Sequence, residues 1–133
     1  MDEALIRRTL PHSVEAEQSV IGSMIMDSDA VMAASEILTA EDFYGNQYGI
    51  LFQAMVELFT AGKPIDIITL QDKLSQMDVP AELSSIEFIR DLLAAVPTSA
   101  NVKYYAKIVK EKSTLRKLIK INEDIANTCY VGK

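Results

Sequence analysis

The stretch PIDIITLQDKL, residues 64–74, decides the fold class of this chain. Four of its residues are good strand formers, namely Ile65, Ile67, Ile68 and Thr69. As a helix, the same stretch has Asp66 as its N-cap, and Ile67, Leu70 and Leu74 follow at helical spacing. The sequence contains no second convincing strand with which this segment could form a sheet. We therefore predict a helix here and an all-α chain.

The segments around this stretch show the same helical periodicity. Apolar residues recur at spacings of three and four, which predicts further helices over about residues 13–26, 27–38, 46–61 and 85–96. Gly22 lies among apolar residues of the first of these helices, and we expect it to pack closely against a neighbouring element. Together the segments predict a globular bundle of about five helices over residues 13–98, preceded by an N-terminal arm over residues 1–12.

The last helix is expected to be longer than this bundle can cover. It begins with Ser99 or Asn101 as its cap and runs for roughly 28 residues, or about 40 Å at 1.5 Å per residue. A domain of about 100 residues has a radius of gyration near 13 Å, so part of the helix lies beyond it. Its apolar residues therefore need a partner. The candidate partner-binding residues are Phe88 on the preceding helix and Leu115, Ile119 and Ile125 on the last one, with burial inside the domain as the alternative for each.

The same helix carries most of the positive charge. Residues 103–120 hold seven Lys or Arg and one acid, in a chain of net charge −6, so the remainder carries −12. The candidate basic surface consists of Lys103, Lys110, Arg116, Lys117 and Lys120. It could contact nucleic acid, but the acidic remainder opposes the approach of phosphate. We expect these side chains mainly to keep an exposed helix soluble and to attract acidic neighbours.

The sequence shows no catalytic, metal or cofactor site. Its five glycines do not form the phosphate-binding loop GxxxxGK[ST], and a single histidine and a single cysteine cannot form a zinc site. The acid pairs Glu15 and Glu17, and Glu41 and Asp42, lie at helix starts, where capping and solvation are the expected roles. His12 is expected to be a loop residue. We therefore expect these 133 residues to have no enzymatic activity of their own.

The compartment is suggested by what the sequence lacks. A single cysteine, Cys129, excludes a disulfide within the chain, and the N-terminus has no signal peptide. No apolar run approaches the roughly 18 residues that a membrane span requires. We expect a soluble protein of the reducing cytoplasm.

Three longer segments are more specific than any of these features. They are HSVEAEQSVIGSMIMD at residues 12–27, EILTAEDFYGNQYGILFQAMVELFTAGKPIDIITLQDKL at residues 36–74, and AAVPTSANVKYYAKIVKEKSTLRKLI at residues 94–119. In order and spacing they resemble the N-terminal domain of DnaB-type bacterial replicative DNA helicases, and the likeness runs from about Pro11 to Tyr130. Two departures are visible. Tyr48 replaces a histidine of many relatives, and Ser84 and Ser85 replace a common glycine pair.

The resemblance implies a small helical bundle followed by a helical hairpin, with residues 99–133 as the first arm of the hairpin and the chain ending in its turn. It implies a non-catalytic collar of a hexameric helicase, which pairs into dimers and a trimer of dimers and docks the C-terminal domain of primase at the replication fork. A helicase loader is a further candidate partner. ATP and Mg would belong to a separate C-terminal motor domain. The alternative function is a nucleic-acid-binding arm that uses the basic face of residues 103–120.

Overall fold

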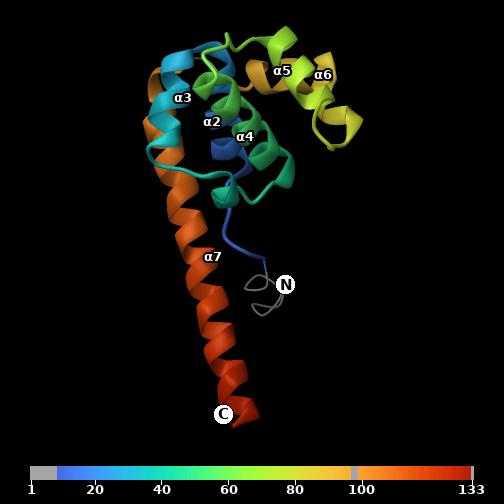
Figure 1. The fold of residues 1–133 in the computed structure, drawn as a ribbon. Coiled ribbons are helices and arrows are strands. Elements are labelled where there is room, and N and C mark those ends of the chain that lie inside the picture. Colours follow the sequence, from blue (N-terminus) through green and yellow to red (C-terminus); the bar gives the residue numbers. More distant parts are fainter. Residues whose placement is uncertain (1–8, 97–98, 133) are drawn as a thin grey trace.

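The computed structural model describes residues 9–96 and 99–132, and within these ranges all regular structure is helical. Figure 1 shows the arrangement, a bundle of short helices from which one long helix projects. The elements in chain order are α2 (Val14–Met26), α3 (Ser28–Ser35), η1 (Ala40–Asp42), α4 (Asn46–Thr60), α5 (Ile67–Ser75), η2 (Ala81–Ser84), α6 (Ile86–Ala94), η3 (Ser99–Asn101) and α7 (Val102–Val131). The predicted all-α class is confirmed.

The stretch that was ambiguous in sequence forms α5, because its first turn is capped from both sides. The Asp66 carboxylate accepts a hydrogen bond from the backbone N–H of Thr69 at 2.8 Å, and the Thr69 hydroxyl accepts one from the backbone N–H of Asp66 at 2.9 Å. Leu70 and Leu74 are buried, whereas Ile68 is 77% exposed. The local capping and the helical burial pattern thus outweigh the strand preference of the isoleucines.

Helix α2 lies at the centre of the bundle and packs against α3, α4, α6 and α7. Its Gly22 allows α6 to approach closely. A Cβ atom at Gly22 would lie 2.5 Å from Val96 Cγ2 and 2.8 Å from the carbonyl oxygen of Leu92. The predicted packing role of this glycine is confirmed.

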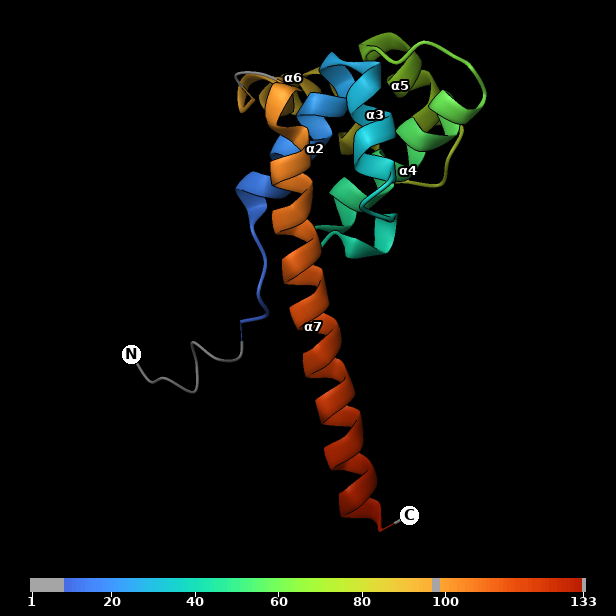
Figure 2. The same cartoon turned by 90° about the vertical axis from the view of Figure 1, so that its left-hand side faces the viewer.

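Helix α7 begins inside the bundle and ends far outside it, as Figures 1 and 2 show. Its 30 residues span about 45 Å. Its buried residues, Val102, Ala106, Val109 and Ser113, all lie in the first half, at spacings of four, three and four. No residue of α7 after Ser113 is buried. The first half of α7 is therefore part of the core, and the second half projects from it.

The start of α7 differs in one detail from the prediction. Asn101 occupies the N-cap position, but its side chain makes no capping hydrogen bond. Instead, the short η3 segment from Ser99 leads directly into the helix. The 3₁₀ turn thus replaces the predicted side-chain cap.

Candidate protein-interaction surface

The projecting half of α7 exposes large apolar side chains. We define the α7 surface as Leu115, Leu118, Ile119, Ile121 and Ile125. Ile119 is half-buried and the other four are exposed, from 46% for Leu115 to 57% for Ile125. Tyr104 and Ile108 extend this surface upstream, because Tyr104, Ile108, Leu115 and Ile119 recur at spacings of four and seven residues. Apolar residues arranged in this way mark an interaction surface.

The bundle side of α7 is a different face of the helix. Val102 and Ala106 each lie two residues from the exposed Tyr104. Two residues correspond to a rotation of about 200° around the helix, so both point to the opposite side. The apolar residues of α7 therefore fall into two groups, one that closes the core and one that the bundle leaves uncovered.

Phe88, the fourth candidate contact residue, lies elsewhere on the molecule. It is half-buried on α6 and lines a hollow of about 590 Å³ between α6 and the start of α4. Its apolar lining includes Ile50 and the buried Leu83, and its acidic lining residues, Glu82, Glu87 and Asp91, are exposed and form a rim. The structure thus separates the candidates into one apolar site on the bundle and another on α7.

The candidate basic residues do not form one free surface. Lys110, Arg116 and Lys117 contact groups of the bundle or of the N-terminal arm. Lys120 is exposed and pairs with Asp124 within the helix at 3.1 Å. Lys103 is exposed near the start of α7. The sequence predicts that these side chains keep an exposed helix soluble and attract acidic neighbours. Three of them lie on the side of α7 that faces the EDFYG turn, residues 41–45, and two of these three pair with an acid of that turn.

Asp42 is the group that these cations face. Its side chain is fully buried at the end of η1, and it accepts hydrogen bonds from the Ser113 hydroxyl at 2.6 Å and the Thr39 backbone N–H at 2.8 Å. Lys117 and Lys110 approach the same carboxylate at 3.2 and 3.4 Å. We call these five residues the Asp42 clamp. Of the two roles expected for Asp42, capping is confirmed by its reciprocal hydrogen bonds with Thr39, and solvation is wrong because α7 supplies its other partners.

The clamp holds Asp42 as a carboxylate. Burial by itself raises the pKa of Asp42, but the hydrogen bonds from Ser113, Thr39 and Lys117 and the charge of Lys110 outweigh it and lower the pKa from 3.8 to about 2. A buried anion is stable only while the groups that donate hydrogen bonds to it stay in place. The clamp therefore ties the EDFYG turn to the middle of α7.

The Arg116 side chain binds the backbone of the same turn. Its guanidinium donates to the carbonyl oxygen of Asp42 at 2.7 Å and to that of Pro11 at 2.8 Å. The guanidinium also lies over the ring of Tyr44, 5.6 Å from its centroid, and the Tyr44 ring stacks on His12 with centroids 4.0 Å apart. Arg116 thus joins α7, the EDFYG turn and the end of the N-terminal arm. His12 acts as an ordered packing residue there.

Glu17 is the second buried carboxylate for which the sequence predicts capping or solvation. It is 2% exposed, and its two oxygens accept hydrogen bonds from the backbone N–H groups of Tyr44 and Gly45, both at 2.9 Å. These amides lie at the start of α4, where backbone N–H groups lack helical partners. Because Gly45 is the N-cap of α4, Glu17 holds the start of α4 from α2. Of the capping and solvation expected for Glu17, solvation is wrong, and the capping is of α4 rather than of its own helix.

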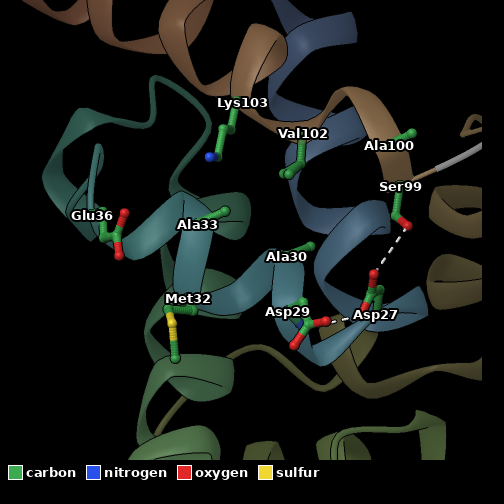
Figure 3. A pocket seen from close by; sticks show the side chains of 10 residues that line it. All are labelled: Asp27, Asp29, Ala30, Met32, Ala33, Glu36, Ser99, Ala100, Val102 and Lys103. Carbon is green, nitrogen blue, oxygen red and sulfur yellow. Dashed lines mark hydrogen bonds between the residues drawn. The ribbon is translucent and has the colours of Figure 1, made fainter.

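A further hollow, of about 440 Å³, lies between α3, η3 and the start of α7, and its lining residues are shown in Figure 3. One of its carboxylates, that of Asp27, is used locally. Asp27 accepts from the backbone N–H of Asp29 at 2.9 Å and from the Ser99 hydroxyl at 3.4 Å, so it caps α3 and joins it to η3. Among the described residues no group of three or more His, Cys, Asp or Glu could hold a metal ion. This hollow has the features of a junction between elements.

No helix in the described ranges is both long enough and apolar enough to cross a membrane. The exposed apolar residues of α7 are interspersed with charged ones such as Lys117, Lys120, Glu123 and Asp124. This pattern favours contact with another protein surface over burial in lipid.

The comparisons with known proteins agree with this architecture. The family model described as "DnaB-like helicase N terminal domain" matches residues 9–111. The replicative DNA helicase DnaB of Geobacillus stearothermophilus is 42% identical over 130 residues, which cover 98% of this chain and 29% of that protein. The replicative DNA helicase DnaC of Bacillus subtilis is 39% identical with the same coverage. The chain thus spans about 29% of the length of these curated relatives.

Solved structures show the same similarity. The N-terminal domain of DnaB helicase from Mycobacterium tuberculosis superposes with a TM-score of 0.89 at 32% identity, covering 93% of this chain and 89% of that one. The N-terminal domain of DnaB helicase from Helicobacter pylori, described with its interactions with primase, gives a TM-score of 0.77 at 22% identity and covers 98% and 99% of the two chains. The second similarity concerns the fold alone. The resemblance inferred from the sequence is confirmed, and the chain belongs to the family of DnaB-like helicase N-terminal domains.

Proposed function

We propose that this domain is the non-catalytic collar of a hexameric replicative helicase, in which it pairs with other copies and docks primase. The observation that carries the proposal is the α7 surface, an apolar face on a helix that projects from its own bundle. Burial of one such side chain contributes about 1.5–3 kcal/mol, so covering several of them would offset much of the cost of association.

The self-association part of the proposal follows from the shape of α7. A projecting helix with an apolar face is covered most simply by another helix that lies along it. A second copy supplies such a helix, and a two-fold contact would place the same face on both sides. We expect pairing through Leu115, Ile119 and Ile125.

The primase part rests on two kinds of support. The Helicobacter pylori domain of this fold is described with its interactions with primase. In the present chain Phe88 lies in a hollow with an acidic rim and no basic lining residue. An apolar floor with a charged rim is typical of a protein interface. We expect Phe88 to contact the C-terminal domain of primase together with Ile119 and Ile125. A helicase loader is a second candidate for the same surface.

Helicase activity would belong to the whole protein. A separate motor domain would bind ATP and Mg and move along single-stranded DNA, while the collar contributes assembly and recruitment. No residue of the domain is assigned a catalytic or cofactor-binding role in this proposal.

A nucleic-acid-binding arm is less well supported. Lys110, Arg116 and Lys117 already bind groups of this chain. A phosphate would have to compete with the buried Asp42 carboxylate for two of them. The exposed cations that remain face the field of an acidic bundle.

The proposal is tested by measuring the mass of the domain in solution by size-exclusion chromatography with light scattering, followed by calorimetric titration with a primase C-terminal domain. A concentration-dependent dimer and saturable primase binding are expected. A strictly monomeric domain that also fails to bind primase would overturn the proposal.

A further inference from the structure

We infer that Asp42 is a positioning residue, which fixes the direction in which the second half of α7 leaves the bundle. In doing so it sets the spacing between Phe88 on α6 and the α7 surface. The inference rests on the proposed function only in naming these two sites as partner contacts. The geometry that carries it stands independently.

The first observation is where the Asp42 clamp lies. Ser113 is the last buried residue of α7, and every later residue is half-buried or exposed. The clamp therefore acts at the point where α7 leaves the bundle. Figure 2 shows how far the helix projects from the bundle. Because α7 is one continuous helix, the contact farthest from its start constrains its direction with the longest lever arm.

The second observation is the kind of contact. Lys110, Ser113 and Lys117 follow at spacings of three and four, so all three reach Asp42 from one face of α7. Apolar packing tolerates small sliding or rotation, but hydrogen bonds to a buried carboxylate are directional. A tilt of α7 away from η1 would remove donors from a buried anion, which is strongly unfavourable. Asp42 thus holds one orientation of the helix.

The third observation is that the turn itself is anchored on its other side. Thr39 and Asp42 form a reciprocal cap around η1, and Glu17 holds the backbone of Tyr44 and Gly45. Arg116 adds two bonds to backbone carbonyl groups, those of Asp42 and Pro11. The Asp42 carboxylate therefore joins α7 to a turn that is fixed to α2. As a result, α7 is held in one orientation relative to the core.

This arrangement has a consequence for recognition. A partner that contacts the α6 hollow and the α7 surface at once binds more tightly when the two sites keep a fixed spacing. The reason is that α7 loses no freedom of orientation on binding. Loss of Asp42 would then weaken two-site binding more than contact at either site alone.

The test uses the full chain and its native Cys129, which is exposed near the end of α7. A second cysteine is introduced as Glu87→Cys beside Phe88, and both thiols are spin-labelled. Pulsed electron paramagnetic resonance then measures the distance between the two labels. The labelled chain is diluted with unlabelled chain, so that only distances within one copy are measured. We expect a single narrow distance distribution, which Asp42→Asn broadens about twofold because the clamp loses its charge. An unchanged width in a folded Asp42→Asn chain would overturn the inference.

Two controls separate positioning from general loss of stability. Asp66→Asn changes an exposed capping aspartate of α5, and Leu74→Val weakens the core at α5, which packs chiefly on α4 and η2. At the same folded fraction, both control variants should leave the width of the distance distribution unchanged. If Leu74→Val broadened the distribution as much as Asp42→Asn does, the inference would be contradicted. If Asp42→Asn does not fold, the pair Ser113→Ala with Lys117→Gln removes two of the three α7 members of the clamp and is measured in its place. These outcomes do not depend on whether primase binds.

Discussion

The hydroxyl of Ser113 donates to the carboxylate of Asp42 over 2.6 Å, although the two residues are 71 positions apart in the sequence. This bond lies at the centre of the contact between the EDFYG turn and the middle of α7. Because the carboxylate is fully buried, its charge state and its donors determine how well the long helix is held.

The first prediction concerns the pH dependence of stability. The folded-state pKa of Asp42, about 2, lies below its usual value of 3.8. The contribution of Asp42 to the free energy of unfolding is therefore fully present above its unfolded-state pKa. This contribution is lost as the pH falls through the folded-state pKa. That contribution is about 2 kcal/mol at neutral pH. We expect Asp42→Asn to be less stable than the original chain by about this amount near pH 6, with the difference shrinking toward zero at about pH 2.

Urea unfolding followed by circular dichroism at several pH values gives the two free energies of unfolding. The difference between the two chains is the informative quantity, because other carboxylates titrate in both. A difference that stays constant between about pH 6 and pH 2 would show that the Asp42 charge does not contribute.

The second prediction concerns Glu17, whose two oxygens each accept a backbone N–H at the start of α4. Glu17→Gln would turn one acceptor into a donor and leave one buried N–H unpaired, which costs about 1–3 kcal/mol of unfolding free energy. Glu15→Gln on the same turn of α2 is a matched control, because Glu15 is exposed and should change stability by less than about 0.5 kcal/mol. Equal effects in the two variants would contradict the capping role.

The third prediction concerns Gly22. Alanine favours a helix by about 1 kcal/mol over glycine, yet its Cβ would lie 2.5 Å from Val96 Cγ2 and 2.8 Å from the Leu92 carbonyl oxygen. We expect the clash to dominate, so that Gly22→Ala destabilises the domain by about 1–3 kcal/mol. The double variant with Val96→Ala should lose less than the sum of the two single changes. A more stable Gly22→Ala chain would show that α6 can move away without cost.

Much of the fold was predictable because its signals are local. The capping pair Asp66 and Thr69 lies within one turn, and the length of α7 follows from its own periodicity. The clamp was not predictable in this way, because Asp42 meets partners 68 to 75 positions away. Carboxylates at helix starts are common for dipole reasons alone, so Asp42 and Glu17 had no local feature that set them apart.

One signal for the clamp was present in the sequence. Ser113 follows Val102, Ala106 and Val109 at the spacing of the buried face, so it is a polar residue at a core position of α7. A buried hydroxyl requires a hydrogen-bond partner. Read with the lysines one turn before and after it, Ser113 pointed to a buried acid somewhere in the bundle, but not to which one.

The fourth prediction separates the nucleic-acid alternative from the proposed function. Since three of the candidate cations bind groups of this chain, we expect only weak binding of a labelled single-stranded oligonucleotide, with a shallow dependence on salt. Fluorescence anisotropy over a range of salt concentrations measures it. A log–log slope steeper than about −2, which corresponds to roughly three phosphates on a single strand, would favour the arm hypothesis instead.

The fifth prediction concerns the α7 surface. Ile119→Asp and Ile125→Asp each place a charge on the face that we expect to pair, so each should weaken self-association and primase binding by at least about tenfold, or about 1.4 kcal/mol. The matched control is Ile68→Asp on α5, where the isoleucine is 77% exposed and lies outside both proposed contact sites. Light scattering and calorimetric titration give the two affinities, and circular dichroism verifies that each variant is folded. Equal weakening by Ile68→Asp would indicate a general effect of added charge, and loss of helix in Ile119→Asp would show that Ile119 supports the fold rather than a partner contact.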